Sequence, residues 1–343
     1  MENVKFYLIA SALPFALSMG LTPLIRHMAL RFGWLDAPAT AIKTHKYPTP
    51  VLGGAAIAAA FFITLLFMRF STEFPTGTLR NLRGIAFGGG LIFLLGIADD
   101  LKKPHGLGFR TKFAVQTLAA LILVYYDIRI RFIEPQYLSM ALSLLWVVGI
   151  SNAINIIDIM DGLAATQIAT ACLGFLCIAL PSESIYVNLA SAALLGAALG
   201  FLPYNFSARH KIFLGDSGSL LAGFILAAVS MGTSYTAINP LGVYAPLFIL
   251  AIPIYDTLFV MVMRMRRGHS PFLGSRDHFA LRLEAMGITR HRIVFLAAMA
   301  AILLSFFAFL VTQLPLVWGI LIYLFAGGEF ILLSLGIARI KMH

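Results

Sequence analysis

The chain has 343 residues, of which 60% are apolar and 12% are charged. Ordinary soluble domains carry roughly 25% charged residues, so this composition indicates a chain surrounded by lipid rather than water. Most of the net charge of +10 at pH 7 lies in the loops expected on one side of the membrane. Nucleic-acid binding is therefore not indicated.

Apolar runs of about 17 to 25 residues recur along the chain, and each can cross a hydrocarbon core of about 30 Å as a helix. Continuous apolar runs favour helices over a closed barrel. We therefore expect an all-α fold, a polytopic transmembrane bundle of about eleven helices that forms one domain over residues 1–343. The first run is expected to be a retained helix rather than a signal peptide, because ten more runs follow. The expected spans cover residues 6–25, 51–68, 84–98, 112–126, 138–157, 162–180, 185–203, 217–233, 240–263, 293–312 and 315–337.

Basic residues gather in alternate loops between these spans. Of the 25 Lys and Arg residues, 19 fall on one side of the membrane if successive helices alternate in direction. Because Lys and Arg accumulate in cytoplasmic loops, we expect the N-terminus outside and the C-terminus in the cytoplasm. Nine of the 15 acidic residues fall on the same side, where acids at the membrane boundary are costly unless they are paired or bind a cation. We therefore expect a functional site on the cytoplasmic side.

The segment THKYPTPVLGG, residues 44–54, leads into the second expected span. Its prolines fix the approach of the chain, and Gly53 and Gly54 permit close backbone contact. We regard His45 and Lys46 as candidate substrate ligands, although an ordinary re-entry turn explains the segment equally well.

Two adjacent acids, Asp99 and Asp100, end the third apolar run, GIAFGGGLIFLLGIADD. Charge balance near the lipid headgroups does not explain a carboxylate pair at the end of an apolar helix, so both are catalytic candidates. Lys112, at the start of the fourth span, is either an anchor whose ammonium reaches the headgroups or a ligand of a phosphate.

The segment NAINIIDIMDGLA places a polar residue at every third position: Asn152, Asn155, Asp158 and Asp161. On a helix, this spacing places two amides and two carboxylates along one slowly drifting face. Gly162 follows directly and permits a ligand to approach the backbone. We interpret the stripe as part of a site, and packing against neighbouring helices is the alternative.

The segment KIFLGDSGSLLAGF places Asp216 at the start of the eighth expected helix. A helix N-terminus presents free backbone N–H groups to anions, and Asp216 could hold a metal ion, so magnesium with a phosphate would satisfy both. A capped helix start is the alternative, because Asp and Ser are good N-caps. The loop over residues 264–292 adds seven arginines on the same side of the membrane.

Paired aspartates, amides and basic residues are the groups needed to transfer a phosphoryl group. The chain has no Walker A sequence, no Cys/His pattern for zinc, and not the spaced aspartates of lipid phosphatidyltransferases. The residues favour transfer from an aqueous diphosphate to a lipid at the inner face of the membrane. The alternative from another class is a secondary transporter, in which intramembrane acids mark an ion path, but the polar motifs do not recur in two halves.

In their order along the chain, these motifs resemble those of the polyprenyl-phosphate N-acetylhexosamine-1-phosphate transferases. The resemblance extends from PTPVLGG through GIADDLK, NAINIIDIMDGLA and GFLPYNF to KIFLGDSGS. It implies transfer of a phospho-N-acetyl sugar from a UDP-sugar to undecaprenyl phosphate, with release of UMP and with Mg²⁺, or alternatively Mn²⁺, as cofactor. It also implies a multi-pass protein of the bacterial inner membrane, in contact with membrane lipid, whose active site faces the cytoplasm. A homodimer is an open alternative.

The resemblance further implies roles for single residues. Asp99 would deprotonate or position the polyprenyl phosphate, Asp216 would bind magnesium, and Phe213 would stack on uracil. The remaining residues carried over are acids near the metal or polar residues of the same pocket: Asp100, Asp158, Asp161, Lys112, Asn155, Asn205 and His278.

Two departures from the family pattern concern the backbone near the metal and the sugar donor. The family usually reads aspartate-glycine where this chain has Asp158-Ile159. Relatives that use UDP-N-acetylglucosamine show His-x-His-His in the last loop, of which only His278 remains, and the consecutive histidines of the peptidoglycan branch are missing. We expect N-acetylglucosamine-1-phosphate as the group transferred, with phospho-N-acetylmuramoyl-pentapeptide as the alternative. We favour direct attack by the polyprenyl phosphate over an aspartyl phosphate, because positioning and charge neutralisation suffice for in-line displacement.

Overall fold

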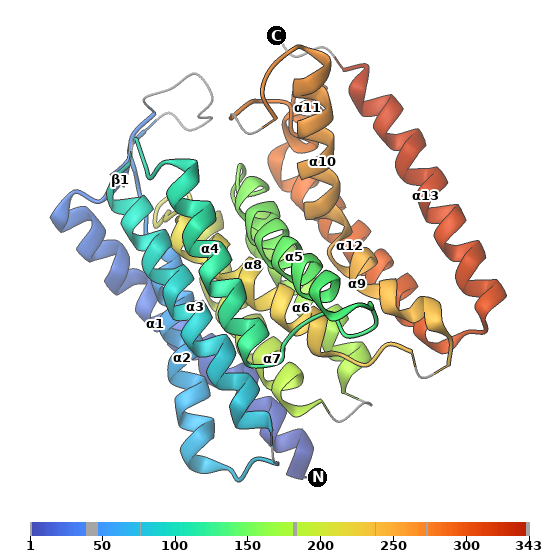
Figure 1. The fold of residues 1–343 in the computed structure, drawn as a ribbon. Helices are drawn as coiled ribbons and strands as arrows, with labels where there is room; N and C mark the ends of the chain where they lie inside the picture. The colour runs from blue at the N-terminus through green and yellow to red at the C-terminus, as the bar shows by residue number, and fades with distance from the viewer. Residues whose placement is uncertain are drawn as a thin grey trace.

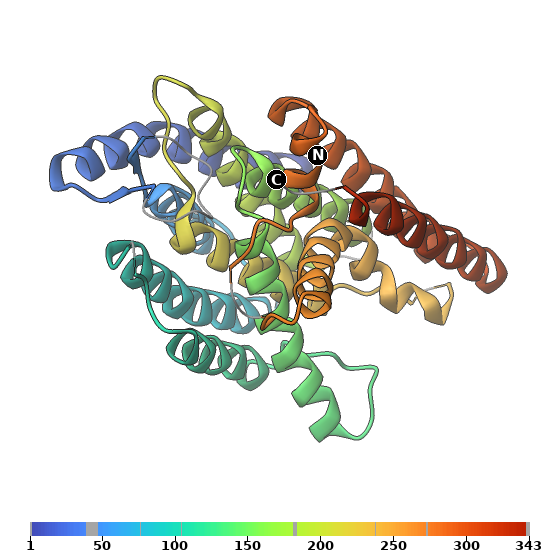
Figure 2. The same cartoon turned by 90° about the horizontal axis from the view of Figure 1, so that it is seen from above.

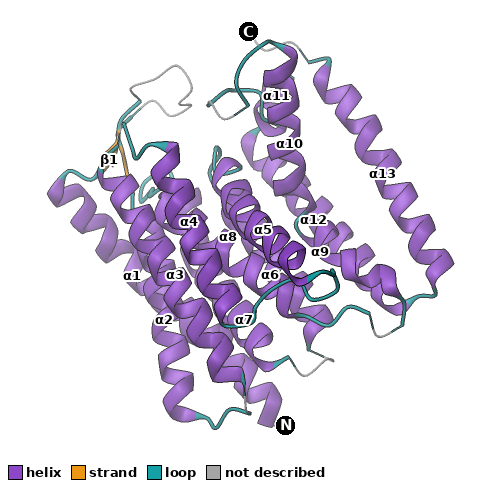
Figure 3. Cartoon of the chain, in the orientation of Figure 1, coloured by secondary structure: helices purple, strands orange, loops and turns teal. Residues whose placement is uncertain are grey.

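The protein is a bundle of helices with one small two-stranded sheet (Figure 1, Figure 3). The computed structural model describes residues 2–38, 47–75, 77–103, 105–180, 184–236, 238–271 and 274–340. Within these residues, the expectation of an all-α fold is confirmed. The elements in chain order are α1 (Glu2–Phe32), β1 (Leu35–Asp36), β2 (Thr49–Pro50), α2 (Gly53–Ser71), α3 (Thr78–Leu101), α4 (Phe109–Tyr125), α5 (Gln136–Ile156), α6 (Leu163–Ala179), α7 (Ile185–Phe206), α8 (Gly215–Gly232), η1 (Pro240–Tyr244), α9 (Ala245–Ile249), α10 (Ala251–Arg266), α11 (Phe279–Ala285), α12 (Arg290–Gln313) and α13 (Leu316–Ala338).

Eight helices in the described part of the chain are long and apolar enough to cross a membrane: α1, α2, α3, α5, α7, α8, α12 and α13. All eleven expected runs are largely helical, but α4 and α6 have only 17 residues each and are not among these eight. Helix α1 begins at one end of the bundle and α13 ends at the other (Figure 1). The number of spans and the side that faces the cytoplasm stay predictions.

The ninth expected span is not one continuous helix. Pro240–Ile249 and Ala251–Arg266 are bent by 71° relative to each other at Leu250. Pro253 explains the break, because a proline inside a helix lacks an N–H donor and its ring collides with the carbonyl four residues earlier, here that of Ile249. The apolar run continues across the break, so hydropathy alone does not reveal it.

Helix α8 is mostly buried and packs against α2, α3 and α5. Two glycines let its first turn approach these neighbours. A Cβ atom on Gly54 of α2 would lie 2.0 Å from the nitrogen of Gly218, and one on Gly96 of α3 would lie 2.4 Å from Cα of Ser217. Because these distances leave no room for a side chain, the glycines let α8 begin directly between α2 and α3.

The short sheet lies beside the start of α8. β1 pairs with β2 in antiparallel register, with Asp36 opposite Thr49. Beyond β2, Phe213 N donates to Pro50 O at 2.9 Å, and Gly53 N donates to Phe213 O at 2.9 Å. The PTPVLGG turn is thereby fastened to the segment that leads into α8.

The helices fall into groups on two sides of the molecule. Figures 1 and 2 place α3 and α4 on the opposite side from α12 and α13, with α5 between the two pairs. Helices α5 and α10 contact each other, so the middle and the last part of the chain meet in this region.

Candidate active site

The carboxylate of Asp100, in the last turn of α3, caps the start of α8. Its Oδ1 accepts a hydrogen bond from Asp216 N at 3.0 Å, and its Oδ2 accepts from Ser217 N at 3.0 Å and from Ser217 Oγ at 2.7 Å. Gly215 has φ +74°, and a Cβ atom there would lie 2.5 Å from Asp100 Oδ2. We expected the free N–H groups of this helix start to bind a substrate phosphate, and this expectation is wrong for Asp216 and Ser217, because a carboxylate from another helix already occupies them.

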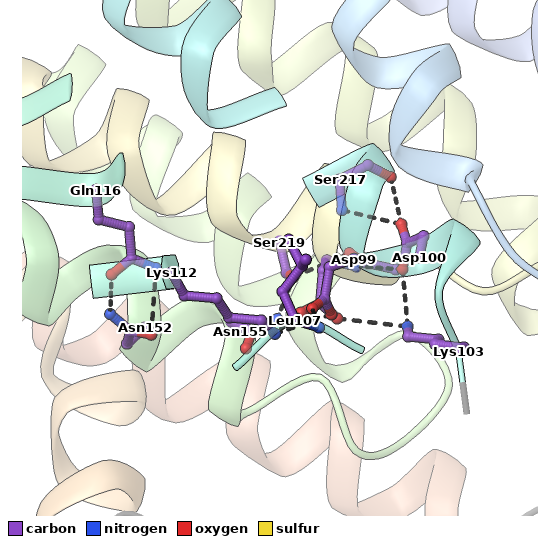
Figure 4. A network of polar contacts seen from close by, with 12 residues as sticks. Asp99, Asp100, Lys103, Leu107, Lys112, Gln116, Asn152, Asn155, Ser217 and Ser219 are labelled. Carbon is purple, nitrogen blue, oxygen red and sulfur yellow. Dashed lines mark hydrogen bonds and ion pairs between the residues drawn. The ribbon is translucent and has the colours of Figure 1, made fainter. Parts of the chain in front are cut away.

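Two lysines form ion pairs with the three aspartates at this point (Figure 4). Lys112 Nζ, reaching from α4, lies 2.8 Å from Asp99 Oδ2 and 2.7 Å from Asp216 Oδ2. Lys103 Nζ lies 2.7 Å from Asp100 Oδ1 and 3.4 Å from Asp216 Oδ1. Burial alone would lower the pKa of Lys103, but the charges of Asp216 and Asp100 hold this pKa above its ordinary value. We call Asp99, Asp100 and Asp216 the carboxylate cluster.

The expected polar stripe is only partly helical. Helix α5 ends at Ile156, so Asn152 and Asn155 lie on the helix while Asp158 and Asp161 lie in the turn before α6. Gly162 has φ +78°, a left-handed conformation that a continuous helix cannot contain. The expectation of one helical face of four residues is therefore wrong, because the chain leaves the helix between its amides and its carboxylates.

The two amides of the stripe have different surroundings (Figure 4). Asn152 Nδ2 donates to Gln116 Oε1 of α4 at 2.7 Å, which joins two helices. Asn155 Nδ2 donates to Ser219 Oγ of α8 at 2.9 Å, and Asn155 also lines a polar cavity of about 340 Å³. Of the two amides, only Asn155 therefore meets the cavity.

The polar cavity lies beside the carboxylate cluster and is lined by residues before α6, at the start of α8, and around α10 and α11. Lys211 Nζ is 2.6 Å from Asp161 Oδ2 and 5.1 Å from the centroid of the Phe213 ring. Burial raises the pKa of Asp158 to about 7, with Lys103 opposing the shift and nearby carboxylates adding to it. The cavity thus combines a carboxyl group with a raised pKa, an ion pair and an aromatic face.

Asn205, at the end of α7, lines the cavity, but both ends of its amide are engaged by the backbone. Its Oδ1 accepts from Gly162 N at 2.6 Å, and its Nδ2 donates to Ile212 O at 3.0 Å. Asn205 therefore fastens the start of α6 to the segment before α8. This arrangement favours a role for Asn205 in positioning these two backbone segments.

Four basic residues of the cavity were not among the predicted site residues: Lys103, Lys211, Arg264 and Arg290. The spacing of Asp100 and Lys103, three residues apart at a helix end, was a usable signal for one of them. The other three lie in loops or at helix ends whose basic residues are already explained by membrane topology, so sequence alone did not distinguish them.

The last loop contributes His278 and Leu281 to the cavity wall. Ala280 is fully buried and does not line the cavity. The family pattern has two further histidines, at the positions of Ala280 and Leu281. Leu281 therefore gives the cavity wall an apolar residue in place of a histidine, and Ala280 fills the protein interior. His45 and Lys46 lie outside the residues that the structure describes.

An apolar groove of about 800 Å³ lies next to the polar cavity. It follows α5 from Leu142 to Ala153, and its other walls come from residues 130–133, from the end of α8 and residues 233–236 after it, and from α9 and α10. The cavity begins on the same helix at Asn155. A polar site and a long apolar surface therefore adjoin along α5, as binding an amphipathic lipid requires.

The carboxylate cluster can supply part of a metal site. Asp99 Oδ2 and Asp216 Oδ2 converge on one cation, the Lys112 ammonium. Magnesium is commonly bound by one or two carboxylates together with substrate phosphates and water. No group of three or more His, Cys, Asp or Glu side chains among the described residues is arranged to hold a metal. The donor set fits an ion shared with a substrate and does not fit a closed structural site.

Sequence comparisons identify relatives of this chain. The model of the family described as "Glycosyl transferase family 4" matches residues 82–234. A "Probable undecaprenyl-phosphate N-acetylglucosaminyl 1-phosphate transferase" of Bacillus subtilis is 31% identical, over 79% of this chain and 75% of the relative. A "Decaprenyl-phosphate N-acetylglucosaminephosphotransferase" of Mycolicibacterium smegmatis is 33% identical, over 79% and 74%. A "Phospho-N-acetylmuramoyl-pentapeptide-transferase" of Streptococcus agalactiae is 29% identical, over 64% and 69%. The chain therefore belongs to glycosyl transferase family 4, whose matched segment contains the whole carboxylate cluster.

Proposed function

We propose that this chain transfers N-acetylglucosamine-1-phosphate from its UDP-sugar to undecaprenyl phosphate at the cytoplasmic face of the bacterial inner membrane, and releases UMP. The observation that carries the proposal is the position of the carboxylate cluster at a polar cavity that adjoins an apolar groove. A water-soluble diphosphate and a lipid phosphate must meet at such a place. The product would begin a lipid-linked glycan of the cell envelope.

The polar cavity supplies groups suited to the nucleotide sugar. Phe213 offers an aromatic face, and Arg264 and Arg290 bring positive charge to the same cavity. Arginine binds phosphate oxygens through a planar set of donors. The names of the Bacillus and Mycolicibacterium relatives favour N-acetylglucosamine as the sugar.

The apolar groove supplies a surface for the polyprenyl chain. Its walls include Trp146, Leu247 and Leu258, and it extends along α5 toward the carboxylate cluster. An isoprenoid placed there would keep its hydrocarbon in apolar surroundings while its phosphate approached Asp99. This arrangement supports the transferase over a secondary transporter, which would need its site near the midplane between two repeats.

Asp216 and Asp99 would hold Mg²⁺, or alternatively Mn²⁺, together with oxygens of the donor diphosphate. The ion would supply charge neutralisation for the donor diphosphate, in which the bond between the uridine phosphate and the sugar phosphate breaks. Lys112 and Lys103 would carry positive charge to the same oxygens. Asp100 would act indirectly, because its carboxylate holds the backbone of Asp216 in place.

We infer direct attack of the lipid phosphate on the donor phosphorus, with Asp99 positioning or deprotonating the acceptor. An aspartyl phosphate would add a covalent step for which the site offers no separate need. Incubation with labelled UDP-sugar without lipid acceptor tests this point, because a trapped aspartyl phosphate would contradict direct attack.

The proposal is tested with purified protein and a panel of UDP-N-acetyl sugars, by measuring release of UMP. We expect release with UDP-N-acetylglucosamine that requires undecaprenyl phosphate, stops with a chelator and returns with Mg²⁺. Asp216→Asn should abolish release, whereas the same replacement at Asp127, in the loop between α4 and α5, should preserve it. UMP release that does not require undecaprenyl phosphate, or that continues in the Asp216→Asn variant, would refute the proposal.

A further inference from the structure

Asp256 is a buried acid outside the carboxylate cluster. It lies on α10, beyond the break at Leu250, and its side chain has no exposed surface. A carboxylate inside a membrane-spanning helix is costly unless other groups bind its oxygens. Its partners therefore indicate why the position holds an acid.

Both carboxylate oxygens of Asp256 bind the start of α11. Oδ2 lies 2.7 Å from Nδ1 of His278, and Oδ1 accepts a hydrogen bond from the backbone N of Phe279 at 3.0 Å. One side chain thus caps the short helix α11 and holds the imidazole ring at its first end. The side chain of His278 is itself only 6% exposed, yet it lines the polar cavity.

The residues around His278 are anchored separately. Asp277 Oδ1 lies 2.7 Å from Arg282 Nη2 and 3.1 Å from Arg267 Nη1. Arg282 is buried, and its Nη1 also donates to Ile340 O at 2.7 Å, beyond the end of α13. Contacts other than those of Asp256 therefore also hold the backbone at position 278, and Asp256 adds the orientation of the ring.

The hydrogen bond to Asp256 determines which ring nitrogen a ligand can reach. Because a carboxylate accepts hydrogen bonds, Nδ1 carries the proton, and Nε2 is the nitrogen that is not engaged by Asp256. Arg264 and Arg290 line the same cavity, so its basic side chains suit an anion. Opposite a phosphate oxygen, Nε2 donates a hydrogen bond when it also carries a proton.

We propose that Asp256 is a positioning residue of the donor site, which holds His278 so that Nε2 binds the diphosphate of the nucleotide sugar. This inference rests on the proposed function and deepens it. The charged groups near the pair are Arg264, Arg267, Arg282 and Asp277, which stay unchanged in the variants below. Carboxylates that orient a metal-bound histidine typically contribute about 10-fold to 100-fold to affinity or activity, and we expect an effect of similar size for Asp256.

The test compares Asp256→Asn with the wild type in steady-state kinetics of UMP release. Asparagine keeps the size of the side chain and can still accept the Phe279 hydrogen bond, but it cannot stabilise an imidazolium. We expect the KM for the UDP-sugar to rise about 10-fold to 100-fold while the KM for undecaprenyl phosphate changes less than about 2-fold. His278→Gln should give the same selective rise without removing the buried acid.

A double variant distinguishes positioning from a general structural role. If Asp256 acts through His278, adding Asp256→Asn to His278→Gln should change the donor KM less than about 2-fold further. Asp127→Asn is the matched control for the loss of one carboxylate and should leave both KM values unchanged. Donor and acceptor KM values that rise together, or full additivity of the two changes, would overturn the inference. A wild-type protein that releases no UMP from any donor would instead refute the proposed function.

Discussion

Replacing Asp100 with alanine should weaken the start of α8 and displace Asp216. In the structure, one carboxylate accepts two backbone hydrogen bonds and one hydroxyl hydrogen bond from this helix start, and it pairs with Lys103 at 2.7 Å. Alanine removes all of these interactions. Because Asp216 N donates to Asp100 Oδ1, the backbone that carries the expected metal ligand loses its support.

The size of the effect follows from the interactions that are lost. Loss of a helix N-cap costs about 0.5 to 2 kcal/mol, and a hydrogen bond to a charged group contributes about 1.5 to 3 kcal/mol. Lys103 keeps a weaker contact with Asp216 at 3.4 Å, which limits the penalty of a buried unpaired charge. We expect Asp100→Ala to destabilise the protein by about 3 kcal/mol, and Asp100→Asn by about 2 kcal/mol, because the amide keeps one acceptor oxygen but replaces the other with a donor.

Thermal unfolding in detergent, at one scan rate and with chelator present, measures this order of stability. UMP release measures the effect on the site, and we expect Asp100→Ala to lower kcat at least about 100-fold through misplacement of Asp216. An Asp100→Ala variant that unfolds at the wild-type temperature would refute the capping role. Asp100→Asn that unfolds as early as Asp100→Ala would refute it as well.

Three further predictions concern other parts of the site and its support. Lys112→Met should lower kcat about 100-fold in the UMP assay, and Lys112→Arg should retain more activity, because the ammonium neutralises Asp99 and Asp216. Asp158→Asn should raise the unfolding temperature at pH 8 and leave it unchanged at pH 4, measured with chelator. The pKa of Asp158 in the folded protein is about 7, above its ordinary 3.8. The wild-type protein therefore loses stability as pH rises from 3.8 through 7. Asparagine does not ionise, so the variant does not lose this stability. Arg282→Met should destabilise the protein by about 3 to 5 kcal/mol in thermal or denaturant unfolding, because it leaves Asp277 with one partner; equal stability would contradict a structural role for this ion pair.

The carboxylate cluster could be predicted because its members are out of place in an apolar sequence. Asp99 and Asp100 end a membrane-spanning run and Asp216 begins one, so a cation or partner was to be expected at each position. The different roles of the three aspartates could not be predicted. That Asp100 binds the backbone at Asp216 depends on how closely α8 approaches α3, which is set by the packing at Gly96.

Other features escaped prediction for identifiable physical reasons. The three-residue spacing from Asn152 to Asp161 suggested a helix, but α5 ends at Ile156, before Asp158, and the chain then turns through Gly162 into α6. Basic residues such as Lys211 and Arg264 were already explained by the topology of the membrane loops. Asp256 stood in the sequence as an isolated acid within an apolar run, which was a signal for a buried partner, but its partner lies 22 residues away beyond a basic loop.

The break at Leu250 connects the two substrate surfaces of the proposed reaction. A straight span would carry α9 and α10 along one axis, whereas the 71° bend turns them in different directions. Both halves then line the apolar groove, and the end of α10 brings Arg264 to the polar cavity. The same bent helix carries Asp256, which holds the start of α11 and the ring of His278. One proline-dependent break thus shapes the wall for the lipid and places the histidine for the donor, so a change at Pro253 should affect both substrates, whereas a change at Asp256 should affect only one.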